Sequence, residues 1–333
     1  MPAVIREVLK HYPEITQPWH EPQDLGNAGG LSGARFWKYR SALGELVLKR
    51  WPSPGPTRST LRRNHDWLRQ ASPLPFVPLP ILADNGETFL EILGHLWELQ
   101  PWMPGTAPTA DPSDPAQVGL AFEALAAFHD QLAEESRNGV SPGLAARLEE
   151  VDGWISRDFA RVERIITNQT QDPALELAQQ WLTLARDQAP RIKMLLESVA
   201  RVAVRLQPCL KDIRREHWLF EGGHLSGLVD FGAMDRDNVA TDLSRLASDW
   251  FGDDPVFRDL ALKSYTSVRR LDPSEIGLIG VFDQSADLLV GGHWVRWLLI
   301  DRREFETPGA IIRGLSKGVG RLSKRAESRR PWK

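Results

Sequence analysis

The chain has 333 residues, which is more than one ordinary core needs and enough for two lobes. Its composition, 42% hydrophobic and 26% charged, is typical of a soluble globular protein, and a formal net charge of −3 argues against general attraction to nucleic acid or anionic membranes. Cys209 is the only cysteine, so an internal disulfide is excluded. Without a signal-peptide pattern or an apolar run of bilayer length, we expect a cytoplasmic protein.

The N-terminal part of the chain is predicted to be rich in β-strands. Strand-like runs at residues 34–40 and 45–51 flank a glycine-containing turn and predict a hairpin. A second hairpin is expected over residues 79–93, with Asp84-Asn85-Gly86 at its tip, because Asn-Gly suits tight turns. Residues 57–72 between the two hairpins are expected to form one helix that stops before Pro73.

Residues 97–115 are extended and then rich in proline, which indicates a hinge at about residues 98–103. Beyond it, Asp114-Pro115 and Asp172-Pro173 have the pattern of helix N-termini, and helices are also expected after residue 255. We therefore predict an α+β protein with two lobes: a β-rich nucleotide-binding lobe over residues 1–101 and a mostly helical lobe over 102–333.

A glycine-rich turn within residues 25–39 is the first candidate binding element. Its backbone N–H groups can form a concavity for anions. Lys49 follows two strands later and could return beneath the same phosphates, although a lysine in an apolar strand is more often an edge residue with its ammonium in solvent. The candidate phosphate-binding residues are Gly29, Gly30, Ser32, Gly33 and Lys49.

The stretch LKDIRREHWLFEGGHLSGLVDFGAMD, residues 210–235, has an aspartate on each side of a predicted hairpin. Phosphoryl transfer to an alcohol requires a carboxylate that orients the hydroxyl, a carboxylate on Mg²⁺, a cation for the phosphates and a second metal ligand. Asp212, Asp230, Lys49 and His217 can fill these roles in that order. The alternative is that Asp212 and Asp230 are loop carboxylates that cap turns.

Together, these pieces resemble the aminoglycoside phosphotransferase and choline kinase family, a branch of the protein-kinase-like fold. The matching segments occur in the family's order over roughly residues 20–255, and they are GGLSGARFW, LVLKRW, WELQPWMPG, EALAAFHDQLA, the loop at Asp212, GLVDFG and ATDLSRL. The resemblance implies a bilobal protein-kinase-like fold and a phosphotransferase that uses ATP and Mg²⁺.

The resemblance also implies residue roles. Lys49 would contact the α- and β-phosphates, and the backbone of Glu98, Leu99 and Gln100 would hold the adenine. The remaining implied roles are a catalytic aspartate, a cation at the γ-phosphate, a Mg²⁺ ligand and a structural aspartate, filled by Asp212, Arg214, Asp230 and Asp242, respectively.

Three departures from the family pattern stand out. Leu210 replaces the usual histidine before the catalytic aspartate, and His217 replaces the usual asparagine after it. His217 is expected to bind the metal, with a preference for Mn²⁺ over Mg²⁺, or to hydrogen-bond Asp212 or a phosphate. The helix glutamate that partners the strand lysine has no clear match, so His65 or Asp66 substitutes for it or Lys49 pairs elsewhere.

The sequence thus predicts a kinase that transfers the γ-phosphate of ATP to a hydroxyl of a small molecule, such as an amino sugar, a choline-like alcohol or a sugar. The alternative is a nucleotide-binding, pseudokinase-like regulator with little transfer. A protein-modifying kinase is disfavoured because ATDLSRL follows Asp230 too closely for an activation loop. ATP and the acceptor are the expected partners, without nucleic acid or membrane, and the sequence does not specify an oligomeric state.

Overall fold

The computed structural model describes residues 2–27, 33–109, 113–167, 172–303 and 309–328. The chain forms two compact units. The first unit contains residues 1–135, 210–235 and 249–270, and the second contains residues 136–209, 236–248 and 271–333. The first unit continues past residue 101 and also includes both candidate aspartates, so these units differ from the predicted lobes. The lobe boundary at residue 101 stays a prediction.

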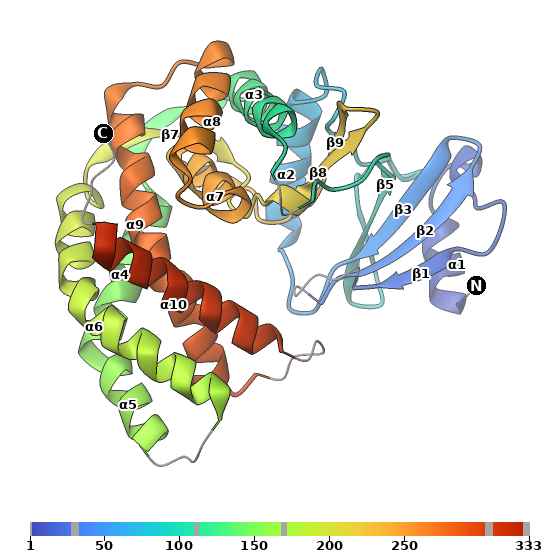
Figure 1. Ribbon diagram of the computed structural model, residues 1–333. Coiled ribbons are helices and arrows are strands. Elements are labelled where there is room, and N and C mark those ends of the chain that lie inside the picture. The colour runs from blue at the N-terminus through green and yellow to red at the C-terminus, as the bar shows by residue number, and fades with distance from the viewer. Residues whose placement is uncertain (1, 28–32, 110–112, 168–171, 304–308, 329–333) are drawn as a thin grey trace. The chain divides into compact units, whose positions relative to one another are not determined.

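The first unit contains a five-stranded antiparallel sheet (Figure 1). Its strands lie in the order β1-β2-β3-β5-β4 and span Gln23–Gly26, Arg35–Ser41, Gly44–Arg50, His95–Pro101 and Leu90–Ile92, respectively. The predicted first hairpin is confirmed as β2–β3. Because side chains alternate across a strand, each strand contributes to two different faces.

One face of this sheet packs on helix α1, Ala3–Leu9, which Figure 1 shows beside the strands. Ile5 and Leu9 of the helix join Trp37, Leu48 and Trp97 of the sheet in one apolar cluster, all of them buried. Burial of these large side chains from water stabilises the sheet on this side. Residues of the opposite parity, among them Lys49 and Glu98, are therefore on the other face.

Helix α2, Arg58–Gln70, forms where the sequence predicts it. It begins after Thr57, whose side chain accepts a hydrogen bond from the Thr60 N–H. Leu61 of this helix packs with Trp51 and Phe89 in a second small apolar cluster. The helix is thereby attached to the end of β3.

The second hairpin differs from the prediction. The structure turns at Leu93-Gly94, between β4 and β5, and both residues have positive φ, 52° and 74°. Asp84-Asn85-Gly86 does form a local turn, closed by the Gly86 N–H and the Ala83 carbonyl at 2.8 Å. Pairing across this turn includes the Ala83 N–H and the Glu87 carbonyl at 2.9 Å, but two residues earlier the Ile81 N–H donates to the Leu99 carbonyl at 2.8 Å.

The rest of the first unit consists of two longer helices and a two-stranded hairpin. These are α3, α8, β8 and β9, which span Pro115–Gln131, Pro255–Val268, Trp218–Glu221 and His224–Leu228. The Asp114 side chain accepts from the Ala116 N–H at 2.9 Å, so the predicted N-cap of α3 is confirmed. Short 3₁₀ turns occur at Glu14–Thr16, Ala133–Glu135 and Arg215–His217.

Residues 103–106, which follow β5, lie along the β8–β9 hairpin. Thr106 and Phe220 exchange two backbone hydrogen bonds, of 3.0 and 2.9 Å, and the Ser226 hydroxyl donates to the Pro104 carbonyl at 2.7 Å. A Cβ at Gly227 would lie 2.7 Å from Cβ of Met103, so only glycine allows this approach without displacement. Before this segment, the Trp102 N–H donates to the Glu45 carbonyl of β3 at 2.9 Å.

The second unit is mostly helical, as predicted for this part of the sequence. Its helices α4, α5, α6, α9 and α10 span Pro142–Gly153, Phe159–Thr167, Pro173–Val199, Pro273–Val295 and Ala310–Ser328, and α7, Ala240–Trp250, lies mainly within it. A three-stranded sheet in the order β10-β7-β6 spans Asp235–Asp237, Ala203–Cys209 and Arg137–Val140. The chain also has π-helical turns at Trp154–Asp158 and Arg296–Ile300.

Two buried carboxylates of the second unit are paired with arginines that are partly exposed. The Asp287 carboxylate accepts from Arg321 and Arg325 at 2.8 and 2.7 Å. Asp158 accepts from Arg296 at 2.8 Å. No helix among the described residues is both long enough and apolar enough to cross a lipid bilayer.

Candidate active site

The β8–β9 hairpin brings the two ends of the candidate catalytic segment together. Its strands pair from Trp218 opposite Leu228 to Glu221 opposite His224, and Gly222-Gly223 form the tip with φ of 56° and 81°. Positive φ at both central residues suits a two-residue hairpin turn. At the open end, the Val229 N–H donates to the His217 carbonyl at 3.0 Å, which aligns the residue before β8 with the residues after β9.

This alignment places His217 beside Asp230. The distance from His217 Nε2 to Asp230 Oδ2 is 3.8 Å, and Asp230 has a φ of 66°, a left-handed conformation that aspartate tolerates better than most residues. Burial lowers the pKa of His217, although Asp230 opposes this shift, so the ring is neutral at pH 7. Its Nδ1 is buried and has no hydrogen-bond partner among the described residues.

Asp212 and Arg214 form the second part of the site. Arg214 Nη2 lies 3.2 Å from Asp212 Oδ2, and Nε lies 3.4 Å from Oδ1, so the guanidinium spans both carboxylate oxygens. Burial opposes the charge of Arg214, but Asp212 outweighs it and raises the Arg214 pKa. The charges of both residues also act on His217, which makes them neighbours of the His217–Asp230 pair.

The partner of Lys49 is Glu98, a residue of β5. Lys49 Nζ lies 3.7 Å from Glu98 Oε1, and His65 Nε2 of α2 lies 2.8 Å from Glu98 Oε2. Asp66, the other candidate considered for a helix carboxylate, pairs instead with Arg69 at 2.6 Å. Lys49 therefore pairs with a strand residue and not with a residue of α2. His65 of α2 contacts the carboxylate of Glu98, not the ammonium of Lys49.

Sequence reasoning missed the side-chain role of Glu98. The informative signal was register: β3 and β5 pair with Lys49 directly opposite Glu98, and directly opposed residues share a face of the sheet. Burial would raise the pKa of Glu98, but the hydrogen bond with His65 and the charge of Lys49 outweigh burial and lower it. Glu98 is thus ionised although only 2% of it is exposed.

Trp51 lies between Lys49 and the segment that contains Asp230. Lys49 Nζ is 3.5 Å from the centroid of the Trp51 ring, a cation–π contact. A Cβ at Gly232 would lie 2.7 Å from Cη2 of the same indole and 3.5 Å from Asp230 Oδ1. The absence of a side chain at Gly232 thus lets the Asp230 turn approach the indole that contacts the lysine.

The remaining predicted nucleotide contacts stay predictions. Glu98, Leu99 and Gln100 lie inside β5 opposite β3, and the Leu99 carbonyl accepts the Ile81 N–H. Gly33 has a φ of 78°, as a glycine turn allows. The other loop residues, Gly29, Gly30 and Ser32, lie outside the described residues.

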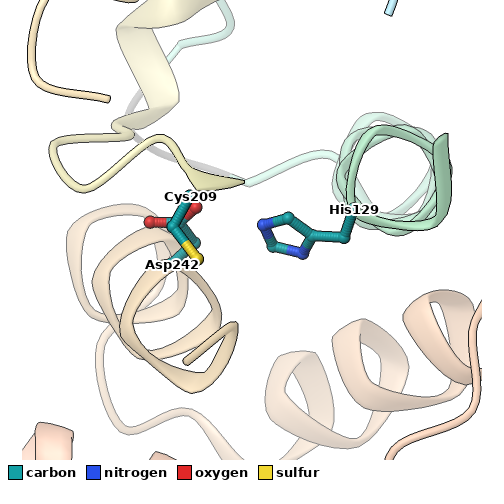
Figure 2. A group of neighbouring side chains, drawn as sticks. All are labelled: His129, Cys209 and Asp242. Carbon is teal, nitrogen blue, oxygen red and sulfur yellow. The ribbon is translucent and has the colours of Figure 1, made fainter. Parts of the chain in front are cut away.

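Figure 2 shows His129 and Cys209 together with Asp242, the implied structural aspartate. His129 of α3 is completely buried, and its Nδ1 lies 2.8 Å from the Tyr265 hydroxyl. Asp242 is also completely buried, in the first turn of α7. At the start of that helix, the Asn238 side chain accepts the Ala240 N–H at 3.0 Å.

One protein-family profile and several solved structures match this chain. The profile of the family described as "Phosphotransferase enzyme family" matches residues 25–274. The chain is similar in structure to an aminoglycoside phosphotransferase from Alicyclobacillus acidocaldarius, with a TM-score of 0.66, 15% identity, and coverage of 98% of this chain and 94% of that one. A search of curated proteins found no match.

Two other solved structures are similar to the chain. Amicoumacin kinase hAmiN, solved with AMP-PNP, Ca²⁺ and Ami, has a TM-score of 0.61 and 16% identity, with coverage of 98% of this chain and 93% of that one. A microcompartment-associated aminopropanol kinase has a TM-score of 0.61 and 14% identity, with coverage of 98% and 97%. At these identities the similarity establishes the kinase-like fold.

Proposed function

Because this chain belongs to the phosphotransferase enzyme family, we propose that it transfers the γ-phosphate of ATP to a hydroxyl of a small molecule. An amino sugar, a choline-like alcohol or a sugar is the proposed acceptor class. The observation that supports this most strongly is the cluster of Asp212, Arg214, His217 and Asp230 at the open end of the β8–β9 hairpin. The names of the similar structures, which include an amicoumacin kinase and an aminopropanol kinase, support the same class.

In the proposed reaction, Asp212 orients the acceptor hydroxyl and accepts its proton as the oxygen attacks the γ-phosphorus. The bond from that phosphorus to the β–γ bridging oxygen breaks, and ADP leaves. Arg214 then shifts from Asp212 toward the phosphoryl oxygens, where its charge stabilises the transition state. Lys49 neutralises the α- and β-phosphates as a compact point charge. The adenine is proposed to lie along the end of β5, at residues 98–100 and those that follow.

The donor set at Asp230 fits a divalent cation. A neutral imidazole whose Nε2 lies 3.8 Å from a carboxylate oxygen can share one ion with that carboxylate, and His217 also has an unpartnered buried nitrogen among the described residues. His217 and Asp230 would hold Mg²⁺ or, with the nitrogen ligand, Mn²⁺. Bound there, the ion supplies charge neutralisation on the phosphates. A similar structure was solved with AMP-PNP and Ca²⁺, which supports nucleotide and divalent-cation binding.

The test is ATP turnover with a panel of amino sugars, choline-like alcohols and sugars, in Mg²⁺ and in Mn²⁺. We expect Asp212→Asn to lower the rate with the active acceptor by about a thousandfold, since the residue orients the reacting oxygen. Asp259→Asn is the matched control, because Asp259 pairs with Lys263 on the surface of α8. An unchanged rate in Asp212→Asn contradicts the assignment.

A second candidate is a nucleotide-binding regulator without transfer. It is favoured by Leu210, which is buried and apolar where the family usually has a histidine. This reading predicts ATP binding by calorimetry with no phosphorylated product for any acceptor or metal. Product formed by wild type and lost in Asp212→Asn excludes it.

A further inference from the structure

A row of side chains crosses the face of the sheet that does not pack on α1. In the ladder, Phe36 of β2 is opposite Lys49 of β3, and Lys49 is opposite Glu98 of β5. Strand alternation puts all three on the same face, away from the cluster that contains Leu48 and Trp97. The sheet itself therefore fixes which carboxylate can reach the lysine.

The ammonium of Lys49 is confined on two sides. Glu98 Oε1 lies 3.7 Å from Nζ, and the Trp51 ring centroid lies 3.5 Å from it. The Lys49 side chain is 11% exposed and that of Glu98 is 2% exposed. An ionised carboxylate this well buried interacts with the lysine with little screening by salt.

His65 connects this pair to helix α2. Its Nε2 lies 2.8 Å from Glu98 Oε2, and its Nδ1 lies 2.7 Å from the Thr88 hydroxyl. Because an ionised carboxylate only accepts hydrogen bonds, Nε2 must be the donor to Glu98. The imidazole thus occupies one carboxylate oxygen and leaves the other directed at Lys49.

The same helix contacts the segment that follows Asp230. Arg63 Nη2 lies 3.1 Å from Asp235 Oδ1 and 3.5 Å from the Met234 carbonyl. Helix α2 is therefore attached on one side to the carboxylate of the lysine and on the other to the chain after the proposed metal ligand.

We propose that Glu98 is the carboxylate that positions Lys49 for the nucleotide phosphates, and that His65 is a positioning residue that holds Glu98 in place. This inference rests on the proposed function, since it assumes that Lys49 binds phosphate. In this chain, Glu98 of β5 would pair with Lys49, supported by His65 of α2. In the family pattern a glutamate on the helix has this role. Asp66 is excluded from the task, because its carboxylate is exposed and paired with Arg69.

The experiment compares the binding of ATP and of adenosine by calorimetry. Adenosine has no phosphates, so the ratio of the two affinities reports on phosphate contacts, whereas a loss of structure weakens both ligands alike. We expect Glu98→Gln to lower the preference for ATP over adenosine by about tenfold, which is typical for the loss of a charged hydrogen-bonding partner. His65→Leu should lower it less, and His65→Gln, which retains a donor near the position of Nε2, should restore most of it.

Two further variants separate positioning from stability. Glu87→Gln is the control, since Glu87 is exposed and pairs with Arg62 at 2.9 Å; it should leave the ratio unchanged. In Lys49→Met, adding Glu98→Gln should change the ratio little further, because Glu98 acts through Lys49. Equal weakening of ATP and adenosine by Glu98→Gln, or an additive double variant, overturns the inference. A wild type that binds no ATP overturns the proposed function first and this inference with it, a result seen before any variant is made.

Discussion

Carboxylates are held differently in the two compact units. In the second unit, Asp287 is 4% exposed and is paired with two arginines at 2.7 and 2.8 Å. In the first unit, Asp212 and Asp230 are 41% and 54% exposed. Arg214 lies 3.2 Å from Asp212, and the neutral imidazole of His217 lies 3.8 Å from Asp230. A buried, closely paired carboxylate contributes to the fold, whereas an exposed carboxylate with a looser contact can exchange its partner for a ligand.

The pKa shifts of two buried carboxylates sharpen this contrast. Burial raises the pKa of Asp287, and Arg321 and Arg325 oppose that shift without reversing it. Burial acts in the same direction on Glu98, but the His65 hydrogen bond and the charge of Lys49 reverse it. The first unit thus keeps a negative charge under Lys49 even in a buried position.

The largest effect is expected at Asp230. Asp230→Asn should lower ATP turnover by about a thousandfold, because it removes the charge that is proposed to hold the metal. Asparagine also tolerates the positive φ of 66° at this position, so the thermal midpoint should change little. Rates under saturating acceptor and circular dichroism melts measure the two quantities. A large fall in the melting temperature with an unaffected rate would show that Asp230 stabilises the fold and does not hold the metal.

The next effect is expected at Asp287 and concerns stability. Asp287→Asn removes the buried carboxylate charge that two half-buried guanidinium groups share, so the free energy of unfolding should fall by about 3 kcal/mol. Urea unfolding measures it, and Glu163→Gln is the control, because Glu163 forms an exposed pair with Arg186 and should leave the midpoint near wild type. Equal small changes in both variants would show that burial of the Asp287 pair does not matter.

The pH dependence of Glu98 gives a smaller effect with a defined sign. Its folded pKa is lowered from the ordinary value of 4.5, so its contribution to stability is present above pH 4.5 and is lost as pH falls through the folded pKa. The difference in unfolding free energy between wild type and Glu98→Gln should therefore shrink on acidification from about pH 6 to about pH 3. Urea titrations at several pH values measure it, and a constant difference contradicts the shift.

The smallest effect is expected at His217. His217→Asn replaces the proposed nitrogen ligand by an amide oxygen, and Mg²⁺ prefers oxygen. The ratio of the rate in Mg²⁺ to the rate in Mn²⁺ should rise by a few-fold. If the ratio stays constant, His217 is a hydrogen-bonding residue and the metal depends on Asp230 and the phosphates alone.

Local patterns in the sequence were sufficient to predict the β2–β3 hairpin, helix α2 after Thr57 and the hairpin that connects His217 to Asp230. Each depends on alternation, a cap or a glycine turn within a short stretch. The pairing of Lys49 with Glu98 was not predictable in this way, because it requires β3 to lie next to β5, with β4 outside. The shift of the second hairpin has a similar cause, the non-local hydrogen bond from Ile81 to Leu99.

The segment after β5 passes from contacts with the sheet to contacts with the β8–β9 hairpin. The Trp102 N–H is bonded to the Glu45 carbonyl of β3, whereas Met103 packs on Gly227 and Thr106 pairs with Phe220 of the β8–β9 hairpin. The peptide between Trp102 and Met103 is therefore the place in this segment where contacts with the sheet give way to contacts with the hairpin. A substitution at this joint therefore tests the connection between sheet and hairpin without removing any of the proposed phosphate contacts.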